Sequence, residues 1–299
     1  MTSLRWLAIT FVAIALITGT LSDRPRQTPP LMLGGYRVIA ADFHVHSFPL
    51  SWATLAPWDL VLEAERQDLD AIAITGHNNI WTAEVGRRFS QWIGGPTVLI
   101  GEEVVTPTHH LLALGINQTV SWRLPTVEAI DEIHRQNGVA IAAHPMAQYR
   151  ESYNAVAMSK LDGSEVLHPI AYVRPRAYLQ FQDFYARLNK AAVGDSDFHG
   201  LGTLGICRTY VFSRDNSPDA ILEALRAGRT VVYDRDGRSF GNPDLIRLTQ
   251  QDPAFQARLE MDRAPLPGPA LPRFFESGAL VILSRLAGLA GLLMLILFA

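Results

Sequence analysis

The chain of 299 residues has few of the residues that mark several common protein classes. Its one cysteine, Cys207, cannot form an internal disulfide, and it excludes a zinc site built from several thiolates. The net charge of −3 leaves no basic surface of the kind that binds nucleic acid. No G-x-S-x-G motif marks a serine nucleophile, and we find no internal sequence repeat.

The N-terminal end is the first of two long apolar segments. Residues 6–21 are almost wholly apolar, preceded by Arg5 and followed by Asp23. They form either the core of a signal peptide or an uncleaved membrane anchor. No clear A-x-A cleavage site follows them, so we favour the anchor.

The C-terminal end is the second apolar segment. Residues 278–299 are apolar except for Ser284 and Arg285, and their length suits a membrane span of about 20 residues. Residues 286–299 offer no polar face, which favours a membrane helix over an amphipathic helix docked on the domain. We therefore divide the chain into a signal-anchor or transmembrane segment (1–22), a linker (23–35), a catalytic barrel (36–250), a connector (251–276) and a C-terminal transmembrane helix (277–299).

Between these ends, strand-like and helix-like stretches alternate. Short apolar runs predict strands at 36–40, 71–75, 97–100, 110–114, 139–143, 165–167, 191–194 and 230–233. Amphipathic or proline-initiated stretches predict helices at 57–67, 81–92, 126–136, 178–188 and 218–227. Residues 147–163 are typical of a loop. The alternation predicts repeated β-α units in a parallel barrel.

Residues 41–47 are the stretch around which the rest is organised. Asp42, His44 and His46 alternate along the end of the first predicted barrel strand, so we expect all three to face the same way. Two imidazoles and a carboxylate on one face are typical of a site for zinc, manganese or iron.

Ligand-type residues also follow or flank the later apolar strands, where active sites lie in α/β barrels. Burying so many imidazoles and carboxylates without a cation would be costly, so they predict a metal site. Neighbours on a strand face opposite ways, so the residues alone do not decide between Glu102 and Glu103. The set is His44, His46, His77, Glu103 or its neighbour, His110, His144, Asp197 and His199.

Taken in order, these motifs resemble those of the PHP family, the polymerase and histidinol phosphatase domain. The resemblance covers about residues 38–235 and implies a distorted (β/α)7 TIM-like barrel, flanked here by N- and C-terminal apolar helices. The strand ends are most similar to the branch that includes carbaryl hydrolase. The motifs read Asp42-x-His44-x-His46, Ile74-Thr75-Gly76-His77-Asn78, Gly101-x-Glu103, His110, Ala143-His144-Pro145 and Ser196-Asp197-x-His199.

The resemblance also implies roles for these residues. It selects Glu103 over Glu102 by the Gly-x-Glu spacing and makes Glu103 a bridging ligand. It gives Asp42 the role of orienting an imidazole. The implied metal ligands are His44, His46, Glu103, His144, Asp197 and His199, with His77 and His110 for a third ion.

The implied activity is hydrolysis by a metal-activated hydroxide, with a phosphoester as the expected substrate. A carbamate, carboxylic ester or amide hydrolase on the same site is the alternative, and a non-catalytic metal-binding module is a third reading. We expect His77 and Asp197 to act in catalysis, a small-molecule substrate and no nucleic-acid partner. The loops carrying Arg150, His168 and Arg174 either recognise substrate charge or are simply solvated. Both termini would anchor the barrel to a membrane, on its extracytoplasmic side.

Two positions depart from family members that bind three metals. Ser51 stands at or near the place of an aspartate, and Gly76 replaces the aspartate before His77. A neutral hydroxyl is a poor ligand for a divalent ion. We therefore predict two tightly held divalent ions, with the third weak or absent. In the alternative, a nearby carboxylate such as Asp59 replaces the missing ligand and three ions bind.

Overall fold

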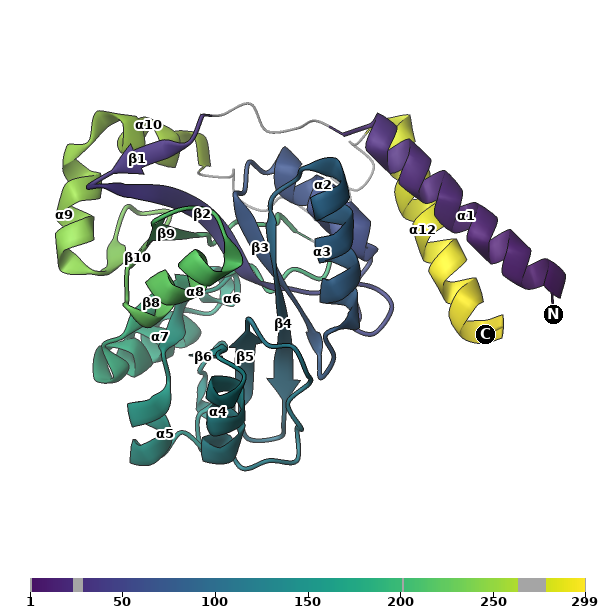
Figure 1. The fold of residues 1–299 in the computed structure, drawn as a ribbon. Coiled ribbons are helices and arrows are strands. Elements are labelled where there is room, and N and C mark those ends of the chain that lie inside the picture. Colours follow the sequence, from purple (N-terminus) through teal and green to yellow (C-terminus); the bar gives the residue numbers. More distant parts are fainter. Residues whose placement is uncertain (1, 24–28, 201, 263–277, 299) are drawn as a thin grey trace.

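The computed structural model describes residues 2–23, 29–200, 202–262 and 278–298. In these residues the strands form one eleven-stranded sheet, which curls into a nearly closed barrel (Figure 1). The strand order is β11-β10-β9-β2-β3-β4-β5-β6-β7-β8, with β1 added to β2. The strands are β1 Leu31–Leu33, β2 Tyr36–Val45, β3 Ala71–His77, β4 Thr97–Val105, β5 His110–Leu114, β6 Val139–Ala142, β7 Gly163–Leu167, β8 Ala191–Gly194, β9 Thr209–Ser213, β10 Thr230–Tyr233 and β11 Ser239–Gly241.

The barrel is closed by side chains where β8 returns to β9 and β10. The amide of Ala192 donates to Thr230 Oγ1 at 3.1 Å, and the amide of Gly194 donates to Thr209 Oγ1 at 2.9 Å. These bonds replace a continuous backbone ladder, so the barrel is distorted, as the family resemblance implied.

The sheet is mixed, which corrects the wholly parallel barrel that we expected. Strands β2, β3 and β4 are parallel, and so are β6, β7 and β8. Strand β5 runs antiparallel to β4 and β6, and β9 runs antiparallel to β2 and β10. Only residues 106–109 join β4 to β5, too few for the crossover that a parallel pair requires.

Helices cover the outside of the barrel and one of its ends. Several begin with a proline, whose fixed φ suits the first turn. Apolar side chains of α8 pack with the barrel residues Ile39, Leu112 and Ile141 in one buried cluster. The helices are α1 Thr2–Leu21, α2 Pro57–Arg66, α3 Trp81–Ile93, α4 Thr126–Arg135, α5 Ala155–Lys160, α6 Ile170–Val173, α7 Pro175–Leu188, α8 Pro218–Arg226, α9 Pro243–Gln251, α10 Pro253–Asp262 and α12 Ala279–Phe298.

Three stretches expected to be irregular contain regular structure. Strand β1 lies in the expected linker, and α5 with a 3₁₀ turn at Ala147–Tyr149 lies in the expected loop. Helix α10 lies in the expected connector, where Phe255 and Leu259 pack against the outer face of the sheet. Burial of these two side chains holds a helix that local composition did not predict. The rest of the connector, residues 263–276, lies outside the described residues.

Helices α1 and α12, the terminal helix pair, lie side by side and antiparallel. They extend away from the barrel, and their N- and C-terminal ends lie near each other at the far end (Figure 1). Over Ser3–Leu21 and Ala279–Phe298, both are long and apolar enough to cross a membrane, by length and composition.

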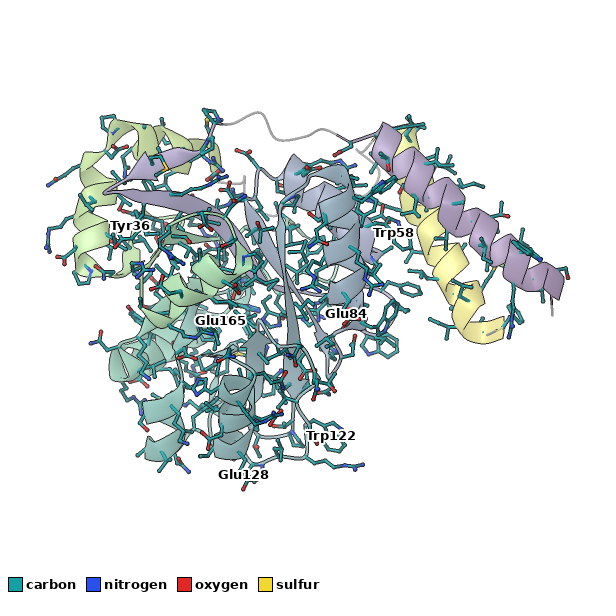
Figure 2. All side chains as sticks on the ribbon, viewed as in Figure 1. Tyr36, Trp58, Glu84, Trp122, Glu128 and Glu165 are labelled. Carbon is teal, nitrogen blue, oxygen red and sulfur yellow. The ribbon has the colours of Figure 1, made fainter. Side chains whose placement is uncertain are left out.

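The near end of this pair is joined to α2 by a polar seam, formed by Asp59 and Glu63 of α2 and by Ser284 and Arg285 of α12. Ser284 Oγ lies 2.8 Å from Asp59 Oδ1, and Arg285 Nη2 lies 2.6 Å from Glu63 Oε2. Trp58 lies on the side of the barrel that faces the helix pair (Figure 2). Because Asp59 points at α12, it does not supply the carboxylate missing beside His77, which corrects that alternative.

Candidate metal centre

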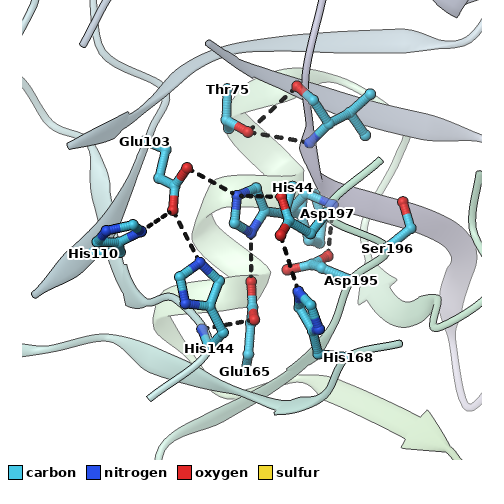
Figure 3. A network of polar contacts seen from close by, with 12 residues as sticks. His44, Thr75, Glu103, His110, His144, Glu165, His168, Asp195, Ser196 and Asp197 are labelled. Atoms are coloured by element: carbon cyan, nitrogen blue, oxygen red, sulfur yellow. Dashed lines mark hydrogen bonds and ion pairs between the residues drawn. The ribbon is translucent and has the colours of Figure 1, made fainter. Parts of the chain in front are cut away.

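The ligand-type residues that end, begin or follow six strands meet at one end of the barrel. Figure 3 shows His44, Glu103, His110, His144 and Asp197 among them. The parallel strands β2, β3 and β4 end there, and β5 begins there because it runs the opposite way. The segments after β6 and β8 supply the remaining members. The side chains brought together are all eight that the sequence singled out: His44, His46, His77, Glu103, His110, His144, Asp197 and His199.

Glu103 occupies the centre of this ligand cluster. Its Oε2 faces three imidazoles, with His44 Nε2 at 3.4 Å, His46 Nε2 at 3.5 Å and His77 Nε2 at 3.2 Å. Its Oε1 faces two others, with His110 Nδ1 at 2.7 Å and His144 Nε2 at 3.0 Å. The two oxygens of one carboxylate therefore serve two separate sets of nitrogen atoms.

The neighbouring carboxylate, Glu102, lies on the other face of β4. It accepts a hydrogen bond from the amide of Val120, and burial raises the pKa of its carboxyl to about 7. Of the two glutamates, the structure places only Glu103 in the cluster. The side-chain alternation of a strand accounts for this difference between adjacent residues.

Asp197 is the second carboxylate of the cluster. Its Oδ1 lies 3.0 Å from His46 Nε2 and 3.4 Å from His44 Nε2. Its Oδ2 lies 3.2 Å from His168 Nε2. The amide of Ile170 donates to His168 Nδ1 at 3.1 Å, so the proton of neutral His168 sits on Nε2 and points at Asp197. His168, left open by the sequence, thus belongs to the site and holds Asp197 in place.

Glu165 in β7 is a site residue that sequence reasoning missed. Its Oε1 accepts from His44 Nδ1 at 2.7 Å, and its Oε2 accepts from the amide of His144 at 2.7 Å. It lies inside the barrel, fully buried (Figures 2 and 3). A carboxylate within a short predicted strand, β7 Gly163–Leu167, was the signal that could have identified it.

Glu165 takes the role that we assigned to Asp42. Asp42 accepts hydrogen bonds from the amides of Ser196 and Gly205, at 3.1 and 2.8 Å, and contacts no imidazole through its carboxylate in the described hydrogen bonds. The pairing of β2 with β3 shifts between Asp42 and Val45, and this irregularity breaks the expected alternation of side chains. Asp42 instead orders the segment that carries Asp197 and His199.

The protonation of His44 depends on the carboxylates that surround it. Its Nδ1–H donates to Glu165, so in the neutral form the Nε2 lone pair faces oxygens of Glu103 and Asp197. That arrangement is unfavourable unless a proton or a cation lies between them. Burial alone would lower the pKa of His44, but the charges of Asp197, Glu103 and Glu165 outweigh it and raise the pKa well above its usual range.

His46 has the opposite behaviour. Burial lowers the pKa of its imidazole to about 4, so it is neutral near pH 7 and its nitrogen lone pair is free to bind a metal. Within the described part of the chain, neither nitrogen of His46 nor Nε2 of His44 has a hydrogen-bond partner. Buried unpaired nitrogens aimed at carboxylates fit a divalent cation bound among them.

The described residues contain three groups of side chains that could each hold a metal ion. Within each group, the ligand atoms all lie within 4.8 Å of one another. Two of the groups contain a carboxylate, and the third consists of imidazoles alone. His77 and His110 face different oxygens of Glu103, and none of the three groups contains both of them. Their assignment to one third ion stays a prediction. The groups are His44 with His46 and Asp197, His44 with Glu103 and His144, and His46 with His77 and His199.

The backbone is strained at the edge of the cluster. Asn78, His144 and Asp197 have positive φ angles of 51°, 23° and 46°, in or near the left-handed region that side chains other than glycine rarely adopt. Each of them ends or follows a barrel strand. Strain of this kind is found where surrounding structure fixes a functional side chain.

Comparison with known families and structures agrees with this geometry. Residues 175–230, which include Asp197 and His199, match the PHP-associated family. The uncharacterised protein MJ1587 of Methanocaldococcus jannaschii is 28% identical over 141 residues, which are 43% of this chain and 81% of that protein.

A solved structure shares the fold. It is a two-domain protein from Bacteroides vulgatus that contains a predicted PHP-like metal-dependent phosphoesterase. The TM-score is 0.57 at 23% identity, and the alignment covers 75% of this chain and 72% of that one. The family match and the shared fold support the PHP family that the motifs resemble. The branch that includes carbaryl hydrolase stays a prediction.

Proposed function

We propose that this chain is a metal-dependent phosphoesterase. The observation that carries the proposal is Glu103, whose two oxygens face two separate sets of imidazoles. A carboxylate that bridges two ions needs this division. The Bacteroides vulgatus protein, which has the same fold, contains a predicted phosphoesterase, and this supports the choice of substrate class.

Both ligand groups that contain a carboxylate include His44, whose one free nitrogen, Nε2, can bind a single ion. One tightly bound ion would therefore lie with His44, His46 and Asp197, and the other with Glu103 and His144. Zinc, manganese or iron would suit these ligands. Divalent ions there would acidify a water and offset the charge of a phosphate. The imidazole group formed by His46, His77 and His199 has no carboxylate of its own, so a third ion would bind weakly or not at all. Ser51 does not supply a ligand to this third ion, because its hydroxyl accepts a hydrogen bond from the amide of His77.

Other residues of the site would position the ligands or act on the substrate and the water. Glu165 and His168 hold His44 and Asp197 in position through the bonds described above. The side chains of His77 and His199 are each 31% exposed and mark the open side of the cluster. His77 is therefore placed to hydrogen-bond a leaving group or to transfer a proton to it, and Asp197 to orient the attacking water.

A second candidate function rests on a different observation. The ring of Tyr149 lies 4.3 Å from that of His110 and 5.3 Å from that of His144. Arg150, a candidate for phosphate recognition, is paired instead with Asp183 at 3.2 Å. The aromatic ring of Tyr149 beside the ligands favours a neutral aryl ester or carbamate as the substrate of the same site.

The test is a substrate screen with the full-length protein in detergent, loaded in turn with zinc, manganese and iron. Phosphate monoesters, phosphodiesters, aryl esters and carbamates are compared with a chelator-treated control. We expect metal-dependent hydrolysis of a phosphoester. Hydrolysis of aryl esters or carbamates alone would establish the second candidate. Tight metal binding without hydrolysis of any of the four would indicate the non-catalytic module.

We also propose that the terminal helix pair anchors the barrel to a membrane, on its extracytoplasmic side. An N-terminal apolar segment normally exports the chain that follows it. Protease added to intact spheroplasts should cut the barrel. Complete protection until lysis would place the barrel inside the cell.

A further inference from the structure

The loop that follows the His44–His46 motif borders the open side of the ligand cluster. We define it as the rim loop, residues 47–56. The amide of His77 donates to Ser51 Oγ at 3.1 Å, and the amide of Thr54 donates to the carbonyl oxygen of His199 at 3.0 Å. These bonds fix the loop against the two most exposed histidines of the ligand cluster.

The rim loop presents large apolar side chains to solvent. Trp52 is 94% exposed and Leu50 is 48% exposed. A single exposed apolar side chain needs no explanation, since much of any protein surface is apolar. Two such side chains on one short loop beside an active-site opening call for a second observation before they suggest a ligand.

That second observation is a hydrophobic cluster that the rim loop shares with the terminal helix pair. Phe48 and Leu55 of the loop belong to the same hydrophobic cluster as Ala15 of α1 and Ala287 and Leu292 of α12. Phe198, which lies between Asp197 and His199, belongs to it as well. The rim loop, Phe198 and the two candidate membrane spans therefore belong to one hydrophobic cluster, which also includes Leu60 and Leu62 of α2.

The polar seam holds this arrangement in place. Helix α2 begins directly after the rim loop, and its Asp59 and Glu63 are bonded to Ser284 and Arg285 of α12. Gly288 of α12 lies so close to Trp58 that a Cβ there would be 3.2 Å from its ring. If the terminal helix pair spans a bilayer, the rim loop and the opening beside it lie next to the membrane surface.

We propose that the substrate is a membrane-resident amphiphile, a phosphoester head group carrying an apolar chain, with the chain held by Leu50 and Trp52. This inference rests on the proposed phosphoesterase function. In the reaction, a bond forms between a water oxygen and phosphorus, and the bond between phosphorus and the ester oxygen breaks. The proton released by the water ends on the leaving oxygen, so the products are an alcohol and inorganic phosphate when the ester is a monoester.

The experiment compares two phosphomonoesters that differ in their apolar part. The full-length, metal-loaded protein is reconstituted in phosphatidylcholine vesicles and given either phosphatidic acid in the vesicles or glycerol 3-phosphate in solution. We expect kcat/KM for phosphatidic acid to be at least about tenfold higher, as burial of an apolar chain predicts. Trp52→Ser should lower the ratio of the two kcat/KM values about tenfold, through the loss of one apolar contact.

Trp92→Ser is the matched control, and it should leave both rates unchanged. Trp92 is 69% exposed and lies at the end of α3 that leads into β4, away from the rim loop. Equal hydrolysis of the two substrates by the wild-type protein would overturn the amphiphile and leave the phosphoesterase standing, without needing any variant. Failure to hydrolyse phosphatidic acid, glycerol 3-phosphate, p-nitrophenyl phosphate and the phosphodiesters of the screen above would instead overturn both.

Discussion

The protein buries two polar clusters that differ in how their groups are paired. In the polar seam, each side chain of α2 meets one of α12, Asp59 with Ser284 and Glu63 with Arg285. In the ligand cluster, Glu103 alone lies within 3.5 Å of five imidazoles. The carboxylates of the polar seam meet hydroxyl and guanidinium donors, which join two helices without any ligand. A carboxylate shared among imidazoles instead leaves nitrogen atoms for cations. Pairing, more than burial, separates a structural cluster from a candidate site.

The strongest way to test this contrast is to remove a ligand. His144→Ala and Asp197→Ala should each lower kcat/KM by more than about 100-fold, beyond the usual effect of losing a residue that only orients a ligand. The fold should remain, because neither side chain belongs to a hydrophobic cluster. Metal content and thermal unfolding, with and without chelator, are measured beside activity. Full activity with unchanged metal content in either variant would remove the assignment.

A weaker effect is expected when the residue that orients His44 is changed. Glu165→Gln keeps the shape but replaces one accepting oxygen by a donor, so it loses one of its two bonds, to His44 or to the amide of His144. Metal affinity or activity should fall about 10- to 100-fold. Glu102→Gln, a buried carboxylate on the other face of β4, is the control and should bind metal normally. Equal losses in the two variants would point to general destabilisation.

Metal removal addresses the difference between the carboxylate-containing groups and the imidazole group. Purified protein dialysed against a weak chelator should keep two equivalents of divalent ion and lose any third. Elemental analysis before and after dialysis gives the count. Retention of three equivalents would contradict our view that His46, His77 and His199 bind weakly without a carboxylate.

The smallest effect concerns the polar seam. Burial raises the pKa of Asp59 from its usual 3.8 to about 6, so the folded protein holds this proton more tightly than the unfolded chain. Stability from this group is therefore present at low pH and is lost as pH rises from about 4 to about 6. Relative to Asp59→Asn, the wild type should gain about 1 kcal/mol between pH 7 and pH 5. Chemical unfolding of both proteins in detergent at the two pH values measures this difference. The same change in unfolding free energy between pH 7 and pH 5 in both proteins would contradict the prediction.

Much of this organisation could be predicted from the sequence because it depends on local pattern. Apolar runs located most of the barrel strands, and the residues at their ends identified seven of the eight members of the ligand cluster. The eighth, Glu103, was chosen over Glu102 by the spacing of the family motif. Features that depend on sheet pairing could not be predicted in this way. The irregularity after Asp42 turned that side chain away from the imidazoles, and Glu165 carries no periodic signal in a strand of five residues. Strand β9 and helices α9 and α10 were missed because their stability comes from contacts with distant parts of the chain.

The positive φ angles of His144 and Asp197 have a consequence for how this protein can evolve. Glycine adopts such a backbone without steric cost, whereas other residues give up on the order of 1 kcal/mol each, somewhat less for histidine and aspartate. Selection for stability alone would favour glycine at both positions. A descendant that no longer needs the proposed activity should therefore lose these two side chains early. That inactive protein should have a higher melting temperature than a protein that keeps them.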